Sequence, residues 1–159
     1  MLHAGWALRL RCVAGREVLT LKSTQKAEGA VHRRREIDQP LDGSANEPRA
    51  DPEQWRAGPV VDLVRRHVRL DGLVTLFEID NHRLACAGPV ADVGVVEQAL
   101  DRFTILTPLG RAVSEAELEI ELKEGEQAAF SEWVRGWAAA SGLTPSPMSK
   151  FERALRLLG

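Results

Sequence analysis

The chain has 159 residues, of which 44% are hydrophobic and 28% are charged, and this balance predicts one soluble globular domain over residues 1–159. Its formal net charge is -2, so no bulk basic surface argues for nucleic acid as a partner. The sequence contains no signal peptide and no apolar run long enough to span a membrane, and we therefore expect a cytoplasmic protein without a membrane partner.

Alternating side chains predict a β-hairpin near the N-terminus. In residues 6–13 apolar and polar side chains alternate, which places Arg9 and Arg11 together on one face of a strand. A turn follows, and residues 19–22 repeat the alternation with Lys22 on the polar face. Both strands are therefore expected to be half-buried, with their charged side chains on one side.

A third strand is expected over residues 30–39, where Arg34, Glu36 and Asp38 share one face. The next stretch, residues 40–52, is rich in Asp, Gly, Ser, Asn and Pro, and this composition predicts a loop. The polar face of the third strand thus continues the series of charged faces that begins in the hairpin.

The middle of the chain is predicted to hold one helix and several strands. A proline is favoured in the first turn of a helix, and a helix is expected over residues 59–71. Residues 73–87 are expected to form one long strand or two short ones, with Arg83 near the middle. Residues 91–101 are expected to form another strand, and residues 103–106 a short separate one.

The clearest alternation in the chain runs through residues 115–123. It places Glu117, Glu119, Glu121 and Lys123 on one face, and apolar side chains on the other. Glutamate, leucine and lysine are also good helix formers, but strict alternation outweighs that propensity and predicts a strand. Three like charges along one strand repel each other, which favours a cation nearby.

Two helices are expected after this strand. Apolar side chains at helical spacing predict an amphipathic helix over residues 130–141, and Gly142 suits its C-cap. Ser149 and Glu152 have the spacing of a capping box, which predicts the start of the last helix. Together with the strands, these helices indicate an α+β fold.

Charged side chains gather on one face of strand after strand, while the opposite faces are apolar. A sheet closed into a barrel of about eight strands has a lumen wide enough for one small ligand. The basic residues on these faces are Arg9, Arg11, Lys22, Arg34, Arg83 and Lys123. The acidic residues are Glu36, Asp38, Asp101, Glu117, Glu119 and Glu121.

A metal-bound polyphosphate would account for the presence of both basic and acidic side chains on these faces. Arginines bind phosphate oxygens bidentately, and carboxylates bind a hard divalent cation such as Mg²⁺. The alternative is an ordinary antiparallel sheet that exposes a balanced set of charges to water. Patterning by itself leaves both interpretations open.

The order of the charged motifs along the chain resembles a known family. The motifs are Arg9-x-Arg11, Thr20-Leu21-Lys22, Arg34-x-Glu36-x-Asp38, Arg83, Leu100-Asp101 and Glu117-x-Glu119-x-Glu121. In this order they resemble the CYTH superfamily of triphosphate tunnel metalloenzymes, which includes inorganic triphosphatases, thiamine-triphosphatases and class IV adenylate cyclases. The segment at residues 149–153 resembles the end of the CYTH domain in inorganic triphosphatases of the CYTH–CHAD type. The resemblance covers nearly the whole chain.

The resemblance implies an antiparallel eight-stranded barrel that forms a tunnel, with helices packed outside it. Its implied ligands are a triphosphate or polyphosphate and Mg²⁺ or Mn²⁺. The implied phosphate-binding residues are Arg9, Arg11, Lys22, Arg34, Arg83, Lys123 and Lys150. The implied metal ligands are Glu117 and Glu119, which would also be catalytic, and Glu121. Residues that would orient the basic side chains or support the metal are Glu36, Asp38 and Asp101.

The sequence departs from the family pattern in two places. The family begins with a strand of alternating Glu-x-Glu-x-Lys, which does not occur here, so we expect a CYTH-like domain truncated at its N-terminus. An upstream segment or a second copy in a homodimer would then complete the barrel. In addition, Phe103 stands where the family usually has a glycine, which could reshape a loop.

The expected activity is metal-dependent hydrolysis of inorganic triphosphate or a related polyphosphate. Metal-assisted attack by water, with arginines neutralising the developing charge, would be its mechanism. One alternative is a catalytically deficient module that binds polyphosphate or nucleotide. Another is chemistry like that of class IV adenylate cyclases, which needs a nucleoside pocket that the sequence does not reveal.

Overall fold

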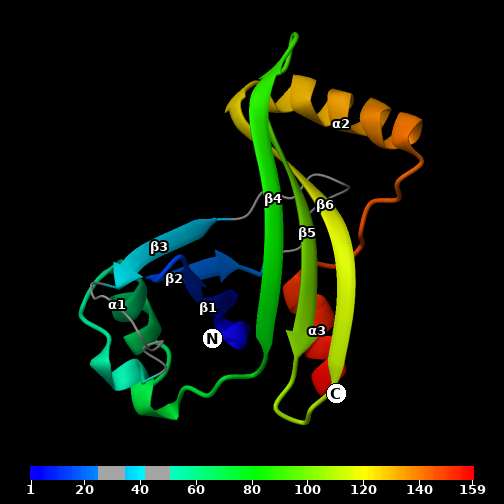
Figure 1. The fold of residues 1–159 in the computed structure, drawn as a ribbon. Coiled ribbons are helices and arrows are strands. Elements are labelled where there is room, and N and C mark those ends of the chain that lie inside the picture. The colour runs from blue at the N-terminus through cyan, green and yellow to red at the C-terminus, as the bar shows by residue number, and fades with distance from the viewer. Residues whose placement is uncertain (25–34, 42–50) are drawn as a thin grey trace. The chain divides into compact units, whose positions relative to one another are not determined.

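The computed structural model describes residues 1–24, 35–41 and 51–159 (Figure 1). These residues divide into two compact units, Met1–Val74 and Thr75–Gly159, which we describe one at a time. Each unit contains a three-stranded antiparallel sheet and at least one helix. The fold is therefore α+β with antiparallel sheets, as predicted, and no closed barrel is formed by the residues described.

The N-terminal unit is built on strands β1 (Trp6–Val13), β2 (Arg16–Ser23) and β3 (Glu36–Leu41), paired in that order. The turn between β1 and β2 consists of two residues, both with positive φ, as tight hairpin turns require. Strand β3 continues to Leu41, so the first two residues of the loop predicted over residues 40–52 belong to a strand, and residues 42–50 lie outside the described residues. Pro40 is tolerated there because β3 is an edge strand.

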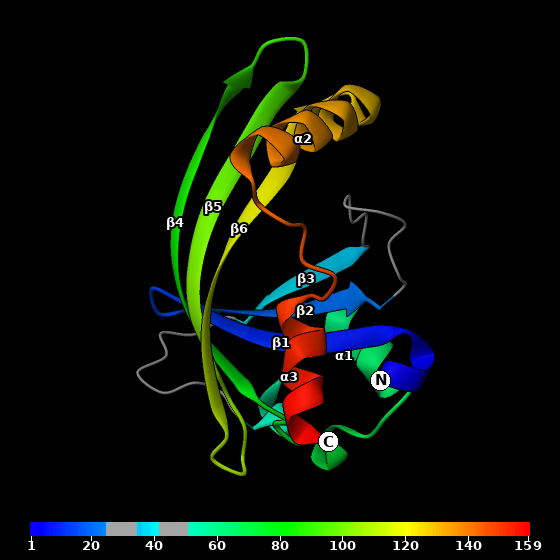
Figure 2. The same cartoon turned by 90° about the vertical axis from the view of Figure 1, so that its right-hand side faces the viewer.

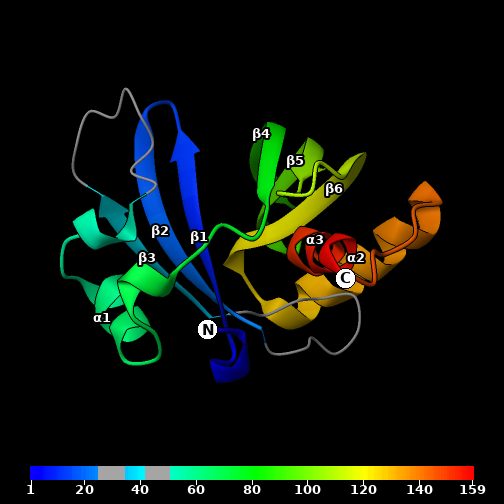
Figure 3. The same cartoon turned by 90° about the horizontal axis from the view of Figure 1, so that it is seen from below.

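The core of this unit lies between the apolar face of its sheet and helix α1 (Pro59–Arg65), which Figure 3 shows beside β3. Leu19 and Leu21 from β2 are fully buried, as is Val60 from α1. The side chain of Gln39 accepts hydrogen bonds from the backbone N–H groups of Val60 (3.0 Å) and Val61 (3.1 Å) and so caps the helix.

Helix α1 is shorter than predicted, because it ends at Arg65 and a separate 3₁₀ turn spans Leu70–Gly72. The residues between them leave helical geometry although their apolar spacing continues. Periodicity reports which face is buried, whereas the end of a helix depends on local backbone hydrogen bonds, so the prediction failed at this boundary.

The C-terminal unit is a meander of three long strands, β4 (Glu78–Val90), β5 (Gly94–Leu106) and β6 (Ala112–Gly125). Residues 91–101 and 103–106 were predicted to be separate strands, but they belong to one strand that begins at Gly94. The alternation continues through Phe103, which is buried like Asp101 and Ile105 on the same face. Phe103 therefore does not interrupt the strand.

Two helices complete this unit, α2 (Gln127–Ser141) and α3 (Lys150–Leu158). The predicted capping box at the start of α3 is confirmed, with Ser149 and Glu152 bonded reciprocally. Helix α3 packs through Ala154 on Phe103 and Ile105, so it lies against the same face of the sheet as Asp101 (Figure 2).

The prediction that the helices pack outside, away from the charged faces, is therefore wrong for α3. At this end of the sheet the predicted charged face carries apolar side chains, which give the apolar stripe of α3 a surface to cover. The opposite face of the same sheet leaves Leu84 63% exposed and Leu100 39% exposed. None of the helices in the described ranges is long and apolar enough to cross a membrane.

Candidate active site

The predicted charged residues of the N-terminal unit share one face of its sheet. The register pairs Arg9 with Thr20 and Thr20 with Asp38, and it pairs Lys22 with Glu36. Lys22 Nζ donates a hydrogen bond to Glu36 Oε1 (2.7 Å). Thr20 Oγ1 donates to Asp38 Oδ1 (2.6 Å). The face carries positive and negative side chains, and the ion pair between Lys22 and Glu36 neutralises part of its charge.

Arg11 and Arg34 were also predicted as phosphate-binding residues of this unit. Arg11 is exposed on the same face, opposite Val18 in the register. Arg34 was predicted to bind phosphate and lies outside the described residues. The alternation of β1 and β2 thus correctly predicted which side chains share a face.

A denser charged cluster forms in the C-terminal unit. The register places Arg83, Asp101 and Glu117 side by side across β4, β5 and β6, and Glu119 follows two residues along β6. Helix α3 adds Lys150 from the same side of the sheet. We call the three carboxylates of Asp101, Glu117 and Glu119 the acidic cage.

Asp101 is the most buried member of the acidic cage, with no exposed surface. Its Oδ1 accepts a hydrogen bond from Arg83 Nε (2.7 Å), and its Oδ2 accepts from Arg83 Nη2 (2.6 Å). Oδ2 also accepts from Lys150 Nζ (2.7 Å). The arginine therefore holds this carboxylate bidentately, which is the strongest and most directional form of such a contact.

The two glutamates of the cage are held by the same kind of contact. Lys150 Nζ donates to Glu119 Oε1 (2.6 Å) and to Glu117 Oε1. Glu119 Oε2 accepts from Arg83, and Glu117 Oε2 accepts from Arg153. Every oxygen of the three carboxylates thus receives a hydrogen bond from a cationic side chain.

The cage shifts the pKa values of the groups within it. Burial by itself would raise the pKa of Asp101, but hydrogen bonds from Arg83 and Lys150 outweigh burial and hold that pKa well below its usual range. Burial opposes ionisation of Glu119 too, yet its bond with Lys150 lowers its pKa. The same bonds overcome the burial of Lys150 and raise its pKa. All these groups are consequently charged at neutral pH.

An aromatic ring supports the cations that α3 contributes. Lys150 Nζ and Arg153 Cζ each lie 5.0 Å from the ring centroid of Phe103, within cation–π range. Phe103 is 3% exposed and also packs on Ala154. The residue that was expected to reshape a loop instead anchors α3 and positions its charged side chains.

Arg153 was not predicted as a site residue. It donates to Glu115 and Glu117, and its Nε is buried without a hydrogen-bond partner. Its spacing of three residues from Lys150, just after a capping box, was the available signal, because residues three apart lie on one face of a helix. The sequence by itself could not show that this face would meet the glutamates.

Glu121 and Lys123 are not part of the acidic cage. Lys123 Nζ donates to Glu121 Oε2 (2.9 Å) and lies 3.2 Å from Glu97 Oε1. The side chain of Glu121 is 64% exposed. Asp101, which was predicted to orient the basic side chains or to support the metal, is the residue that the structure groups with Glu117 and Glu119.

The acidic cage has the composition of a site for a divalent cation. One oxygen from each carboxylate lies within 4.8 Å of the others. Oxygen donors of this type suit hard cations such as Mg²⁺ and Mn²⁺. The residues present thus fit a metal ion, provided that the cationic side chains now bonded to these oxygens give way.

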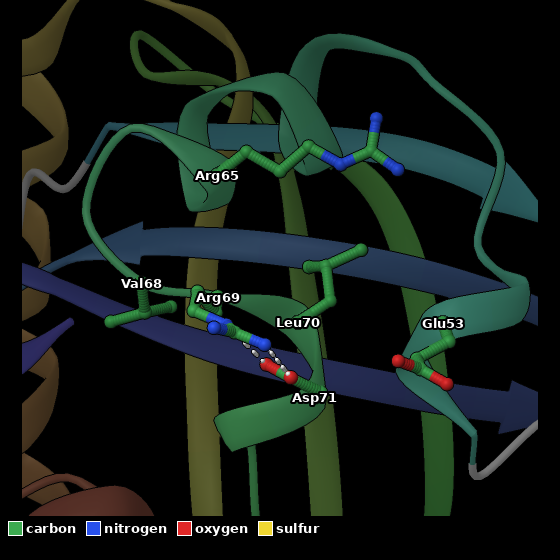
Figure 4. A pocket seen from close by; sticks show the side chains of 6 residues that line it. All are labelled: Glu53, Arg65, Val68, Arg69, Leu70 and Asp71. Atoms are coloured by element: carbon green, nitrogen blue, oxygen red, sulfur yellow. Dashed lines mark hydrogen bonds and ion pairs between the residues drawn. The ribbon is translucent and has the colours of Figure 1, made fainter.

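A surface depression of about 390 Å³ lies in the N-terminal unit, and none of the predicted site residues lines it (Figure 4). Its charged side chains are Glu53, Arg65, Arg69 and Asp71, and Figure 4 shows the ion pair between the last two. Arg69 keeps 86% of its side-chain surface exposed, so this depression offers no enclosed set of ligands.

The family model described as CYTH domain matches residues 3–155, which is nearly all of the chain. No match was found among curated proteins.

Proposed function

This chain belongs to the CYTH domain family, and from that membership and the acidic cage we propose that it hydrolyses inorganic triphosphate or a related polyphosphate with a divalent metal. Members of the CYTH superfamily bind divalent metals, and the chain carries three carboxylates that are close enough together to hold one. The grouping of Asp101, Glu117 and Glu119 amid cationic side chains is the observation that carries the proposal.

The proposed function needs residues that bind a metal and residues that bind phosphate, and the chain has candidates for both. The acidic cage would hold Mg²⁺ or Mn²⁺, while Arg83, Lys150 and Arg153 lie within reach of any anion bound beside that metal. In the N-terminal unit, Arg9, Arg11 and Lys22 would bind phosphate oxygens. The closed tunnel typical of the family is part of the function that we propose.

In the proposed reaction water attacks one phosphorus atom and one phosphoanhydride bond breaks. A P–O bond to the water oxygen forms, the attacking water releases one proton to solvent, and triphosphate yields pyrophosphate and orthophosphate. The metal, when bound, would polarise the phosphate and activate the water. The arginines would hold the phosphate oxygens in place and balance the charge that develops on the leaving group. Arg83 is suited to this task because its guanidinium is held in a fixed orientation.

The proposal is tested by measuring orthophosphate release from inorganic triphosphate with Mg²⁺ or Mn²⁺. We expect metal-dependent turnover that falls at least about a hundredfold in Glu119→Gln, because a preorganised electrostatic contact is worth roughly that much. Glu124→Gln removes the same charge from an exposed position on β6 and should retain activity.

Other outcomes of this assay separate the alternatives. Tight binding of triphosphate without turnover would indicate a binding module, and conversion of ATP to cyclic AMP would indicate cyclase chemistry. If neither triphosphate nor metal binds, the proposed function is wrong.

A further inference from the structure

Lys150 occupies a central position among the three carboxylates of the acidic cage. Its Nζ lies 2.7 Å from Asp101 Oδ2 and 2.6 Å from Glu119 Oε1, and it is also bonded to Glu117 Oε1. Arg83 and Arg153, by contrast, each bond only two acidic side chains. A single amino group therefore takes the position between the oxygens that a metal ion would use.

A divalent cation cannot share these oxygens with Lys150. Mg²⁺ binds its oxygen ligands at about 2.0–2.1 Å, so an ion between the three carboxylates would lie against Nζ. Both groups are positively charged, because a lysine side chain is an ammonium at neutral pH. The remaining cage oxygens offer no alternative, because they accept hydrogen bonds from Arg83 and Arg153.

The side chain of Lys150 can move while its helix stays in place. Helix α3 is anchored by Ala154, which is fully buried against Phe103 and Ile105. The lysine ammonium sits at the end of a flexible four-carbon side chain. The guanidinium groups of Arg83 and Arg153 are rigid and planar, and each is bonded to two carboxylates. Lys150 is 15% exposed, so its Nζ lies near solvent and can leave the cage without unfolding the helix.

We infer that Lys150 is a displaceable occupant of the acidic cage and couples metal binding to polyphosphate binding. The inference rests on the proposed function, in which the cage binds a divalent cation and the basic residues bind polyphosphate. Metal binding expels the ammonium, which is then free to contact a phosphate. Polyphosphate in turn draws the ammonium away and leaves the carboxylates to the metal. Each ligand therefore raises the affinity for the other, as thermodynamic linkage requires.

The inference predicts a gain of metal affinity when Lys150 is removed. Lys150→Met keeps an unbranched side chain that is one atom shorter than lysine, and it removes the competing charge together with the cation–π contact to Phe103. Coupling between two ligands typically changes affinity about 5- to 150-fold. We expect Lys150→Met to bind Mn²⁺ at least about tenfold more tightly than the unaltered protein, with no polyphosphate present.

The experiment titrates Mn²⁺ into the unaltered protein, Lys150→Met and Arg156→Met and follows free Mn²⁺ by electron paramagnetic resonance. Arg156 is an exposed cation on the same helix, so its replacement controls for net charge. If the unaltered protein and Lys150→Met bind Mn²⁺ equally, the coupling is wrong and the proposed function stands. If neither binds Mn²⁺, with or without inorganic triphosphate, the proposed function itself fails.

A second measurement uses the unaltered protein and so does not depend on the variant folding. Acetic anhydride acylates free amino groups, and peptide mass spectrometry gives the extent of reaction at each lysine. Mn²⁺ should increase acylation of Lys150 severalfold while leaving Lys123 unchanged, because Lys123 pairs with Glu97 and Glu121 instead. Saturating Mn²⁺ that binds and leaves Lys150 protected would overturn the inference.

Discussion

Replacement of Asp101 by asparagine should destabilise the protein more than any other single charge removal in the acidic cage. Asp101 is fully buried and accepts three hydrogen bonds, two from Arg83 and one from Lys150. Asparagine keeps one acceptor oxygen but turns an NH₂ group toward the cations. The variant would therefore leave two charged side chains without the carboxylate that compensates them.

The loss of stability in Asp101→Asn depends on how far water can solvate Arg83 and Lys150 once the carboxylate is gone. Removing one member of a buried ion pair typically costs 3–5 kcal/mol. Arg83 is 32% exposed and Lys150 is 15% exposed, so water would recover part of the loss. We expect the free energy of unfolding to fall by about 2–3 kcal/mol at pH 7, measured by urea titration.

Asp71→Asn provides a matched control. Asp71 also holds an arginine bidentately, but the side chain of Arg69 is 86% exposed, so the loss should stay below about 1 kcal/mol. Equal losses in Asp71→Asn and Asp101→Asn would show that burial does not strengthen the cage contacts, and the reasoning would be refuted.

The same variant should change how stability depends on pH. The folded protein holds the pKa of Asp101 below its unfolded value of about 3.9, so this group stabilises the fold above that pH. The stabilisation is lost as the pH falls further and the carboxylate becomes protonated. The difference in unfolding free energy between the unaltered protein and Asp101→Asn should therefore shrink below about pH 4. A constant difference down to pH 2 would contradict this assignment.

Four further variants test the fold by urea titration. Gly125→Ala should cost well over 1 kcal/mol, because its Cβ would lie 2.1 Å from the carbonyl oxygen of Val93. Gly136→Ala, in open space on α2, should instead stabilise by about 0.5–1 kcal/mol, and equal effects of the two would contradict the turn geometry. Gln39→Ala should cost about 1–2 kcal/mol through loss of the α1 cap, and no loss would refute that role. Phe103→Leu should cost about 1–2 kcal/mol as two cation–π contacts are lost, and a neutral result would remove its anchoring role.

Alternation of side chains predicted much of the site because a strand offers only two faces. It correctly grouped Arg9 with Lys22 in one sheet and Asp101 with Glu117 in the other, since paired strands bring residues of the same face together. Glu121 shows the limit of this argument. Glu121 lies on the same face as Glu117, but it pairs with Lys123 and is not part of the acidic cage.

The contribution of α3 could not be derived from periodicity. A capping box predicts where the helix starts, and its apolar stripe predicts that it packs, but neither says against which surface. The surface that α3 covers exists because Phe103 and Ile105 make the predicted charged face apolar near its end. Arg153 escaped prediction for that reason, and Lys150 was expected to contact phosphate and not to bridge three carboxylates.

The central claim is that Asp101, Glu117 and Glu119 bind a divalent cation. The most direct test is a Mn²⁺ titration, in the presence of inorganic triphosphate, of the unaltered protein, the double variant Glu117→Gln, Glu119→Gln, and the control Glu124→Gln. We predict saturable protein-bound Mn²⁺ in the unaltered protein and the control, and its loss in the double variant. Unchanged Mn²⁺ affinity in the double variant would contradict the claim.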